Sequence, residues 1–83
     1  KVSVYPNPFT EKVGISFSDG VPEKGKIMIT DSKGCVVHQV EYTSEDMIQG
    51  GFSFDMTAFP AGVYFLNISA DGFYQSSKIL KEL

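Results

Sequence analysis

Hydrophobic and polar residues alternate along most of this chain, and helical periodicity is nearly absent. The run VGISF at 13–17 places a valine, an isoleucine and a phenylalanine on one side of a predicted strand. The run FSFDM at 52–56 repeats this pattern, and VYFLNISA at 63–70 shows the clearest alternation. A period of two is typical of a half-buried β-strand. The chain is therefore predicted to be all-β.

Turn-forming residues separate the predicted strands. The tetrapeptide DSKG at 31–34 predicts a hairpin, because aspartate can accept hydrogen bonds from its own backbone and glycine adopts positive φ. Asp71-Gly72 predicts a second hairpin with a type I′ turn. No break between the predicted strands reaches the dozen or so residues that a parallel crossover requires. Six or seven short strands so connected predict a seven-stranded antiparallel immunoglobulin-like β-sandwich with Greek-key connections.

The strand expected at Cys35–Tyr42 has no clear inward side. Val36 and Val40 fall on one side of it and Val37 on the other. A strand that is covered on both faces has such a pattern.

Two prolines near the start interrupt the alternation, in Tyr5-Pro6-Asn7-Pro8. Proline has no amide hydrogen and is confined to edges, bulges and first positions of strands. Each proline also holds the residue before it in an extended conformation. We expect a stiff corner that lets the first strand leave one sheet and carries the chain across to the second.

Composition narrows the function classes. The chain has 83 residues, a formal charge of -3 and no arginine, which argues against a nucleic-acid-binding face. No apolar run approaches the roughly 20 residues of a membrane helix. The chain begins at Lys1 without an initiator methionine or a signal peptide. We expect residues 1–83 to be a single domain excised from a larger exported protein.

Residues for catalysis or metal binding are scarce. The single Cys35 cannot form an internal disulfide, and we expect it to be buried or half-buried in a strand. His38 is the only histidine and completes no triad or metal pair. The carboxylates fall in turns or at exposed positions. The sequence therefore predicts no enzyme, no cofactor and no metal.

Some aromatic residues stand where a sandwich would expose them. Phe65 lies on the polar side of its strand, and Phe73 and Tyr74 cannot both face the core because they are adjacent. Exposed Phe65, Tyr74 or Tyr42 could stack on sugar rings in a carbohydrate-binding or spacer module of a secreted enzyme. The absence of tryptophan counts against this alternative. Partial covering of both sheet faces would also explain the pattern.

Four blocks of sequence, in this order, resemble one known family. They are YPNPF, GKIMITDSKGCVV, AFPAGVYFLNI and SSKILKEL, and they are similar to the C-terminal sorting domain of the type IX secretion system of Bacteroidetes. The positions that match the family pattern are Pro6, Asn7, Pro8, Asp31, Gly34, Val36 or Val37, Gly62, Tyr64, Leu66, Lys78, Ile79 and Lys81. The chain departs from the pattern at Glu82-Leu83, where a basic or neutral residue is more usual.

The resemblance implies a role in export. Such a domain is fused to the C-terminal side of a cargo protein and is read in the periplasm by components of the type IX translocon. The cargo then crosses the outer membrane, and a surface sortase usually removes the domain and attaches the cargo to the cell surface. The domain itself would supply no catalysis. The cargo is expected at the cell surface or in the medium.

The sequence also suggests which part is read. We expect the closing hairpin, Val63–Leu83, to present an edge strand from which Lys78 and Lys81 project. Unpaired edge groups can accept a partner strand, and weak self-association through such edges is also expected. The alternative is that the two lysines merely keep the edge soluble.

Overall fold

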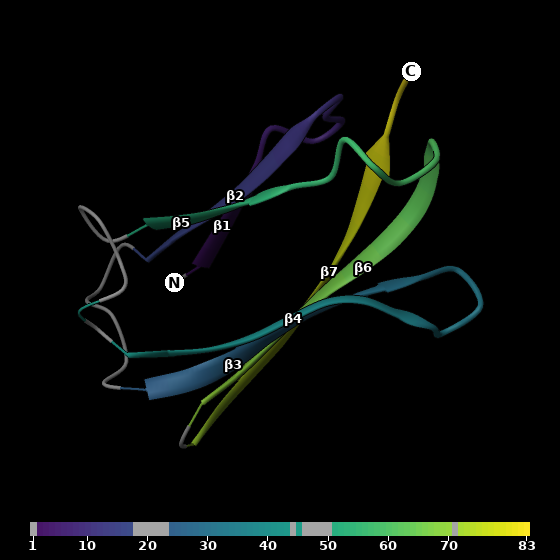
Figure 1. Cartoon of the computed structure of the whole chain (residues 1–83). Coiled ribbons are helices and arrows are strands. Elements are labelled where there is room, and N and C mark those ends of the chain that lie inside the picture. Colours follow the sequence, from purple (N-terminus) through teal and green to yellow (C-terminus); the bar gives the residue numbers. More distant parts are fainter. Residues whose placement is uncertain (1, 18–23, 44, 46–50, 71) are drawn as a thin grey trace.

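The computed structural model describes residues 2–17, 24–43, 45, 51–70 and 72–83, and these residues form two packed β-sheets (Figure 1). The strands are β1 (Val2–Tyr5), β2 (Lys12–Phe17), β3 (Lys24–Asp31), β4 (Val36–Thr43), β5 (Gly51–Asp55), β6 (Gly62–Ala70) and β7 (Phe73–Lys81). The predicted all-β fold with seven strands is confirmed.

Every strand pair in the two sheets is antiparallel. One sheet has three strands in the order β1-β2-β5, and the other has four in the order β4-β3-β6-β7. The short DSKG turn joins β3 to β4, and β6 joins β7 through the predicted hairpin that contains Gly72. Asp71 of that hairpin, and most of the polar breaks at 18–23 and 46–50, lie outside the described residues.

The core lies between the sheets and is filled by the inward positions of each strand. In β6 the side chains of Tyr64, Leu66 and Ile68 are buried, with exposed fractions of 3%, 0% and 0%. The alternate positions of the same strand face outward, as the period of two predicts. The buried hydrophobic residues are Val2, Phe9, Val13, Ile15, Ile27, Ile29, Tyr42, Phe54, Met56, Tyr64, Leu66, Ile68 and Ile79.

A β-bulge explains the ambiguous pattern of β4. The register between β3 and β4 shifts at Ile29/Thr30, so that one extra residue is inserted in β4. Beyond the bulge Val36 turns outward and is 51% exposed. Val37 and Val40 both pack against the core, although they are three positions apart. A bulge is a local change of backbone path that a simple alternation rule cannot anticipate.

The sequence had suggested that the proline corner carries the chain from one sheet to the other, and this expectation is wrong. The corner connects β1 to β2, which are neighbours in the three-stranded sheet. Within the corner the chain reaches the second sheet at Asn7, whose side chain bonds to the backbone of β7, and at Phe9, which forms a parallel bridge with Lys81, before it returns to β2. Burial of the Phe9 side chain, only 1% exposed, between the two sheets accounts for this detour.

The DSKG turn forms as predicted, but Cys35 is not part of a strand. Asp31 Oδ1 accepts hydrogen bonds from the backbone N–H groups of Lys33 and Cys35, each 2.9 Å long. Gly34 has a φ of 91°. These bonds hold Cys35 in the turn just before β4, where it is exposed. The expectation of a buried or half-buried thiol is therefore wrong.

Candidate functional site

The closing strand β7 is the edge strand of the four-stranded sheet, as predicted. Leu80 turns its backbone groups away from β6: its N–H donates to Asn7 Oδ1 over 3.1 Å, and its carbonyl accepts from Phe9 N over 2.9 Å. Hydrogen-bonded and non-hydrogen-bonded pairs alternate along an antiparallel ladder. Lys78, Ser76 and Tyr74 therefore also turn their backbone groups to the outer edge.

Residues Asn7–Phe9, which we call the clamp, occupy half of this edge. Asn7 Nδ2 donates to the Lys78 carbonyl over 3.1 Å, while Asn7 Oδ1 accepts from Leu80 N–H. The Asn7 side chain thus takes the place of a peptide group of a neighbouring strand. Glu82 N–H then donates to the Phe9 carbonyl over 2.7 Å. The sequence had not indicated this clamp, because the two segments lie more than 70 positions apart.

The open part of the edge is short. In the described part of the chain, no hydrogen bond reaches the outward backbone groups of Tyr74 and Ser76. A partner strand running beyond Lys78 would collide with the clamp. The expected edge strand is therefore present, but it offers free backbone groups over only a few residues.

The two lysines of β7 differ in position. Lys78 is exposed. Lys81 is only 8% exposed, and its Nζ donates to the Phe59 carbonyl over 2.8 Å. Residues three positions apart on a strand face opposite sides. The expectation that both lysines project from the edge is therefore wrong for Lys81, whose role in this structure is to close one end of the core.

Most positions at which the sequence resembles the family pattern stabilise the fold. Tyr64, Leu66 and Ile79 are buried in the core, and the Tyr64 hydroxyl donates to the Pro60 carbonyl over 2.5 Å. Burial raises the pKa of Tyr64 above its ordinary value. Gly62, with a φ of 151°, has a backbone conformation that residues with a side chain rarely adopt. Together with Asp31 and Gly34 in their turn, these positions specify the sandwich.

The remaining positions of the pattern are at the surface. Pro6, Asn7, Pro8 and Lys78 are exposed, and the peptide bonds Tyr5-Pro6 and Asn7-Pro8 are both cis. The structure brings all four together, since the Asn7 side chain is bonded to the backbone of β7 at Lys78.

The candidate aromatic residues do not form one platform. Tyr74 is 68% exposed, and its hydroxyl donates to Asn67 Oδ1 over 3.3 Å. Phe65 is half-buried and pairs with Lys78, four residues along β7 from Tyr74, which corresponds to roughly 13 Å. Tyr42 is only 1% exposed. The suggestion that Tyr42 could stack on a sugar is therefore wrong.

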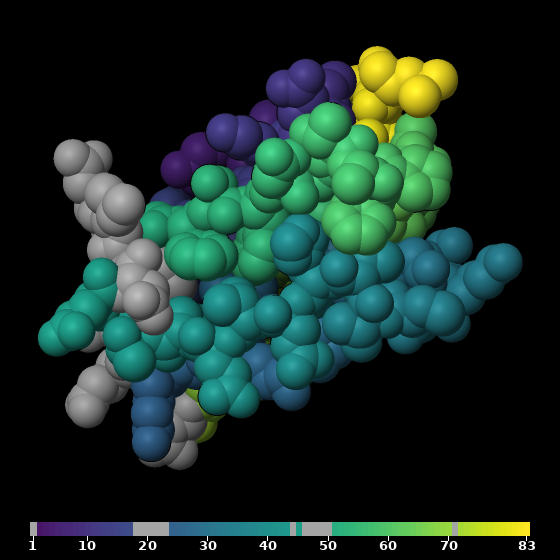
Figure 2. Space-filling view, viewed as in Figure 1, coloured from purple at the N-terminus to yellow at the C-terminus, as the bar shows by residue number. Residues whose placement is uncertain are grey.

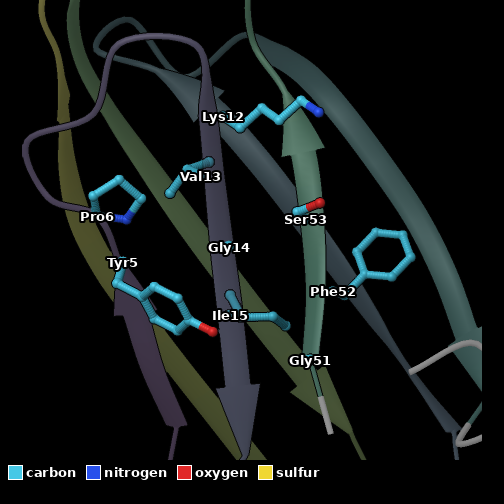
Figure 3. A pocket seen from close by; sticks show the side chains of 9 residues that line it. All are labelled: Tyr5, Pro6, Lys12, Val13, Gly14, Ile15, Gly51, Phe52 and Ser53. Atoms are coloured by element: carbon cyan, nitrogen blue, oxygen red, sulfur yellow. The ribbon is translucent and has the colours of Figure 1, made fainter. Parts of the chain in front are cut away.

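An open groove of about 500 Å³ lies on the outer face of the three-stranded sheet (Figure 3). Its floor is formed in part by Gly14, which places no side chain there. Tyr5, 55% exposed, stands on one side, and Ser53 and Lys12 contribute polar atoms. The sequence pattern did not indicate this groove, because Lys12, Gly14 and Ser53 occupy ordinary outward positions of their strands.

Two titratable groups, Asp55 and His38, have structural partners. The Thr57 hydroxyl and backbone N–H both donate to Asp55 Oδ1, over 2.6 and 2.9 Å, and these bonds lower the pKa of Asp55. The His38 ring packs against Phe54 and Phe59, with ring centroids 5.3 and 5.6 Å apart. Among the described residues, no three histidine, cysteine or acidic side chains could hold a metal ion. Within the same residues no helix is long and apolar enough to span a membrane.

Comparison with known proteins identifies a family. Residues 3–82 match the family model described as "Secretion system C-terminal sorting domain". No curated protein matches the chain.

Among solved structures, the chain resembles a DUF3244 family protein from Bacteroides vulgatus, described as having an immunoglobulin-like β-sandwich fold. The TM-score is 0.74 at 19% identity, and the likeness covers 99% of this chain and 95% of that chain. At this identity the likeness concerns the fold alone, and it confirms the predicted immunoglobulin-like architecture.

Proposed function

The chain belongs to the secretion system C-terminal sorting domain family and serves as a type IX secretion sorting signal, and from this premise we propose the steps that it directs. The domain travels fused to the C-terminal side of a cargo protein and is read, already folded, by a component of the type IX translocon. The cargo then crosses the outer membrane. A surface sortase cuts before the domain and attaches the cargo to the cell surface.

The observation that carries this proposal is the family match over nearly the whole folded chain. The positions at which the sequence resembles the family pattern include buried residues such as Leu66 and Ile79, which help to specify the sandwich, and the exposed residues Pro6, Asn7 and Pro8, which lie near exposed Lys78. A folded sorting signal requires both kinds of residue, because a partner can contact only the exposed groups while the core keeps them in place. The proposal gives the domain no catalytic step.

The arrangement of the chain ends suits a fusion. Gln75 Nε2 donates to the Val2 carbonyl over 3.4 Å, so β1 starts beside the beginning of β7. The clamp and the end of β7 lie at the other end of the sandwich (Figure 1). A cargo joined ahead of β1 would therefore leave the end of β7 accessible to a reader.

The proposal is tested by fusing residues 1–83 behind a signal peptide and a periplasmic reporter. The fusion is expressed in a type IX-competent host and in the same host without the translocon pore. We expect the reporter at the cell surface or in the medium of the competent host only, without the domain's mass after sortase cleavage. A reporter that stays in the periplasm of both hosts would contradict the proposal.

A further inference from the structure

A patch on the outer face of the four-stranded sheet joins the two ends of the chain. Phe9 and Lys81 form a bridge and both turn their side chains into the core, with exposed fractions of 1% and 8%. Pro8 is exposed and lies beside Leu80, because Asn7 and Phe9, on either side of Pro8, both bond to the Leu80 backbone. The Leu80 side chain is 39% exposed.

The register of the sheet extends this patch by one strand. Val63 of β6 pairs with Leu80, and Phe65 pairs with Lys78. All four side chains belong to the outward positions of their strands. Pro8, Val63, Phe65, Leu80 and Lys78 thus form a mostly apolar surface with one cation, which we call the composite patch.

The clamp fixes the composite patch across a long distance in sequence. Asn7 bonds the backbone of Lys78 and of Leu80, 71 and 73 positions away. In the space-filling view the yellow C-terminal atoms lie beside the indigo atoms that follow the clamp (Figure 2). Neither chain end presents this surface alone, because the N-terminal end supplies Pro8 and the C-terminal end supplies Lys78 and Leu80.

We propose that the composite patch is the surface by which a protein subunit of the secretion machinery recognises the folded domain. The inference rests on the proposed function and deepens it, since it assigns recognition to a surface assembled from both ends of the chain and not to the closing hairpin alone. The partner presents an apolar surface to Pro8, Leu80 and their neighbours and a carboxylate to Lys78. Exposed apolar patches rimmed by polar groups mark protein contact sites, and aligned opposite charges fix the orientation of docking.

Two observations favour this patch over the free edge of β7. The clamp leaves few outward backbone groups for a partner strand, as the bonds to Leu80 and Glu82 show. The patch also holds the exposed matched positions Pro8 and Lys78, with Asn7 at its border. A side-chain contact can use all of them, whereas strand addition would have to displace the clamp.

The test compares pairs of variants of the same chemistry in the reporter fusion. Leu80→Ser is paired with Tyr74→Ser, which alters an exposed side chain at the other end of the same strand β7. Lys78→Ala is paired with Lys33→Ala in the exposed DSKG turn. Each domain is also purified alone and its thermal unfolding measured, so that loss of folding is recognised.

The N-terminal side of the patch is tested by its own pair of variants. Pro8→Ser is compared with Pro60→Ser, which alters an exposed proline in another loop. Thr10→Arg is a second variant that retains both prolines and places a bulky cation beside the patch. It serves if Pro8→Ser proves unfolded.

We expect every variant of the patch to lower surface reporter at least about fivefold, as truncation of an interface hot spot does. The three control variants should export like the original domain. Normal export of the folded patch variants would overturn the inference. So would a loss confined to Lys78→Ala and Leu80→Ser, because that result indicates a linear C-terminal signal. Failure of the original fusion to leave the periplasm would instead refute the proposed function.

Discussion

Replacing Asn7 by alanine should destabilise the domain by removing the link between its two ends. The substitution deletes the bonds to the Lys78 carbonyl and the Leu80 N–H, both 3.1 Å long. A hydrogen bond of this kind contributes about 0.5–1.5 kcal/mol, and water can replace both partners at an exposed site. We therefore expect the free energy of unfolding to fall by about 1–2 kcal/mol. A change of 1 kcal/mol lowers Tm by about 4–8 °C in a domain of this size.

Urea unfolding of the purified domain measures this change, with Asn67→Ala as the matched control. Asn67 accepts one longer bond, 3.3 Å, from the Tyr74 hydroxyl on the sheet surface, and its removal should cost less than about 0.5 kcal/mol. Hydrogen exchange provides a second readout, because the Leu80 amide loses its acceptor and should exchange faster in the Asn7 variant. Equal midpoints for the two variants, with unchanged exchange at Leu80, would refute the role assigned to the clamp.

Three further substitutions test the core. Gly25→Ala should destabilise the domain by about 1–3 kcal/mol through overpacking, because a Cβ there would lie 2.8 Å from the Tyr42 ring. Gly14→Ala is the control, since a Cβ at Gly14 would have no contact closer than 3.4 Å. Equal urea midpoints for the two variants would contradict the packing argument. Lys81→Ala should lower the free energy of unfolding by about 2 kcal/mol, because it leaves a cavity and removes the charged hydrogen bond to the Phe59 carbonyl. Lys81→Met should recover part of this loss. Unchanged thermal midpoints in both variants would show that Lys81 is not part of the core. Tyr42→Phe should be neutral or stabilising by up to about 1 kcal/mol, since the buried hydroxyl has no hydrogen-bond partner among the residues that the structure describes. Burial raises the pKa of Tyr42, so the unfolded chain loses this proton first and the original domain should lose stability as the pH rises above about 10; a phenylalanine variant with the same alkaline loss would exclude Tyr42 as its source.

The alternation of side chains was sufficient to predict the sandwich, because the strand rule needs only local information. The inward positions of β6, such as Leu66 and Ile68, follow directly from a period of two. The DSKG turn followed from the chemistry of aspartate and glycine at 31 and 34. These features depend on residues that are close in sequence.

The features that the sequence did not indicate depend on long-range contacts. The bulge that turns Val36 outward is a property of the pairing of β4 with β3. To predict the clamp one must know that Asn7 lies next to Leu80. To predict the burial of Lys81 one must know that the Phe59 carbonyl lies within hydrogen-bond distance of its Nζ. The expectation that both Lys78 and Lys81 project from the edge overlooked the period of two, which turns residues three positions apart to opposite faces.

For the candidate site, the sequence located the exposed end of the closing hairpin but not its second half. Lys78 was expected at the surface and is exposed. Pro8 was expected in a corner, without any indication that the corner lies against β7. The composite patch could be recognised only once the parallel bridge between Phe9 and Lys81 was known.

The central claim is that residues 1–83 are sufficient to send a fused protein across the outer membrane. The most direct measurement is the fraction of a periplasmic reporter that a protease added to intact type IX-competent cells can digest, with and without the domain. The account predicts that most of the tagged reporter is digested or found in the medium, and that the untagged reporter is protected. Equal protection of both reporters would contradict it.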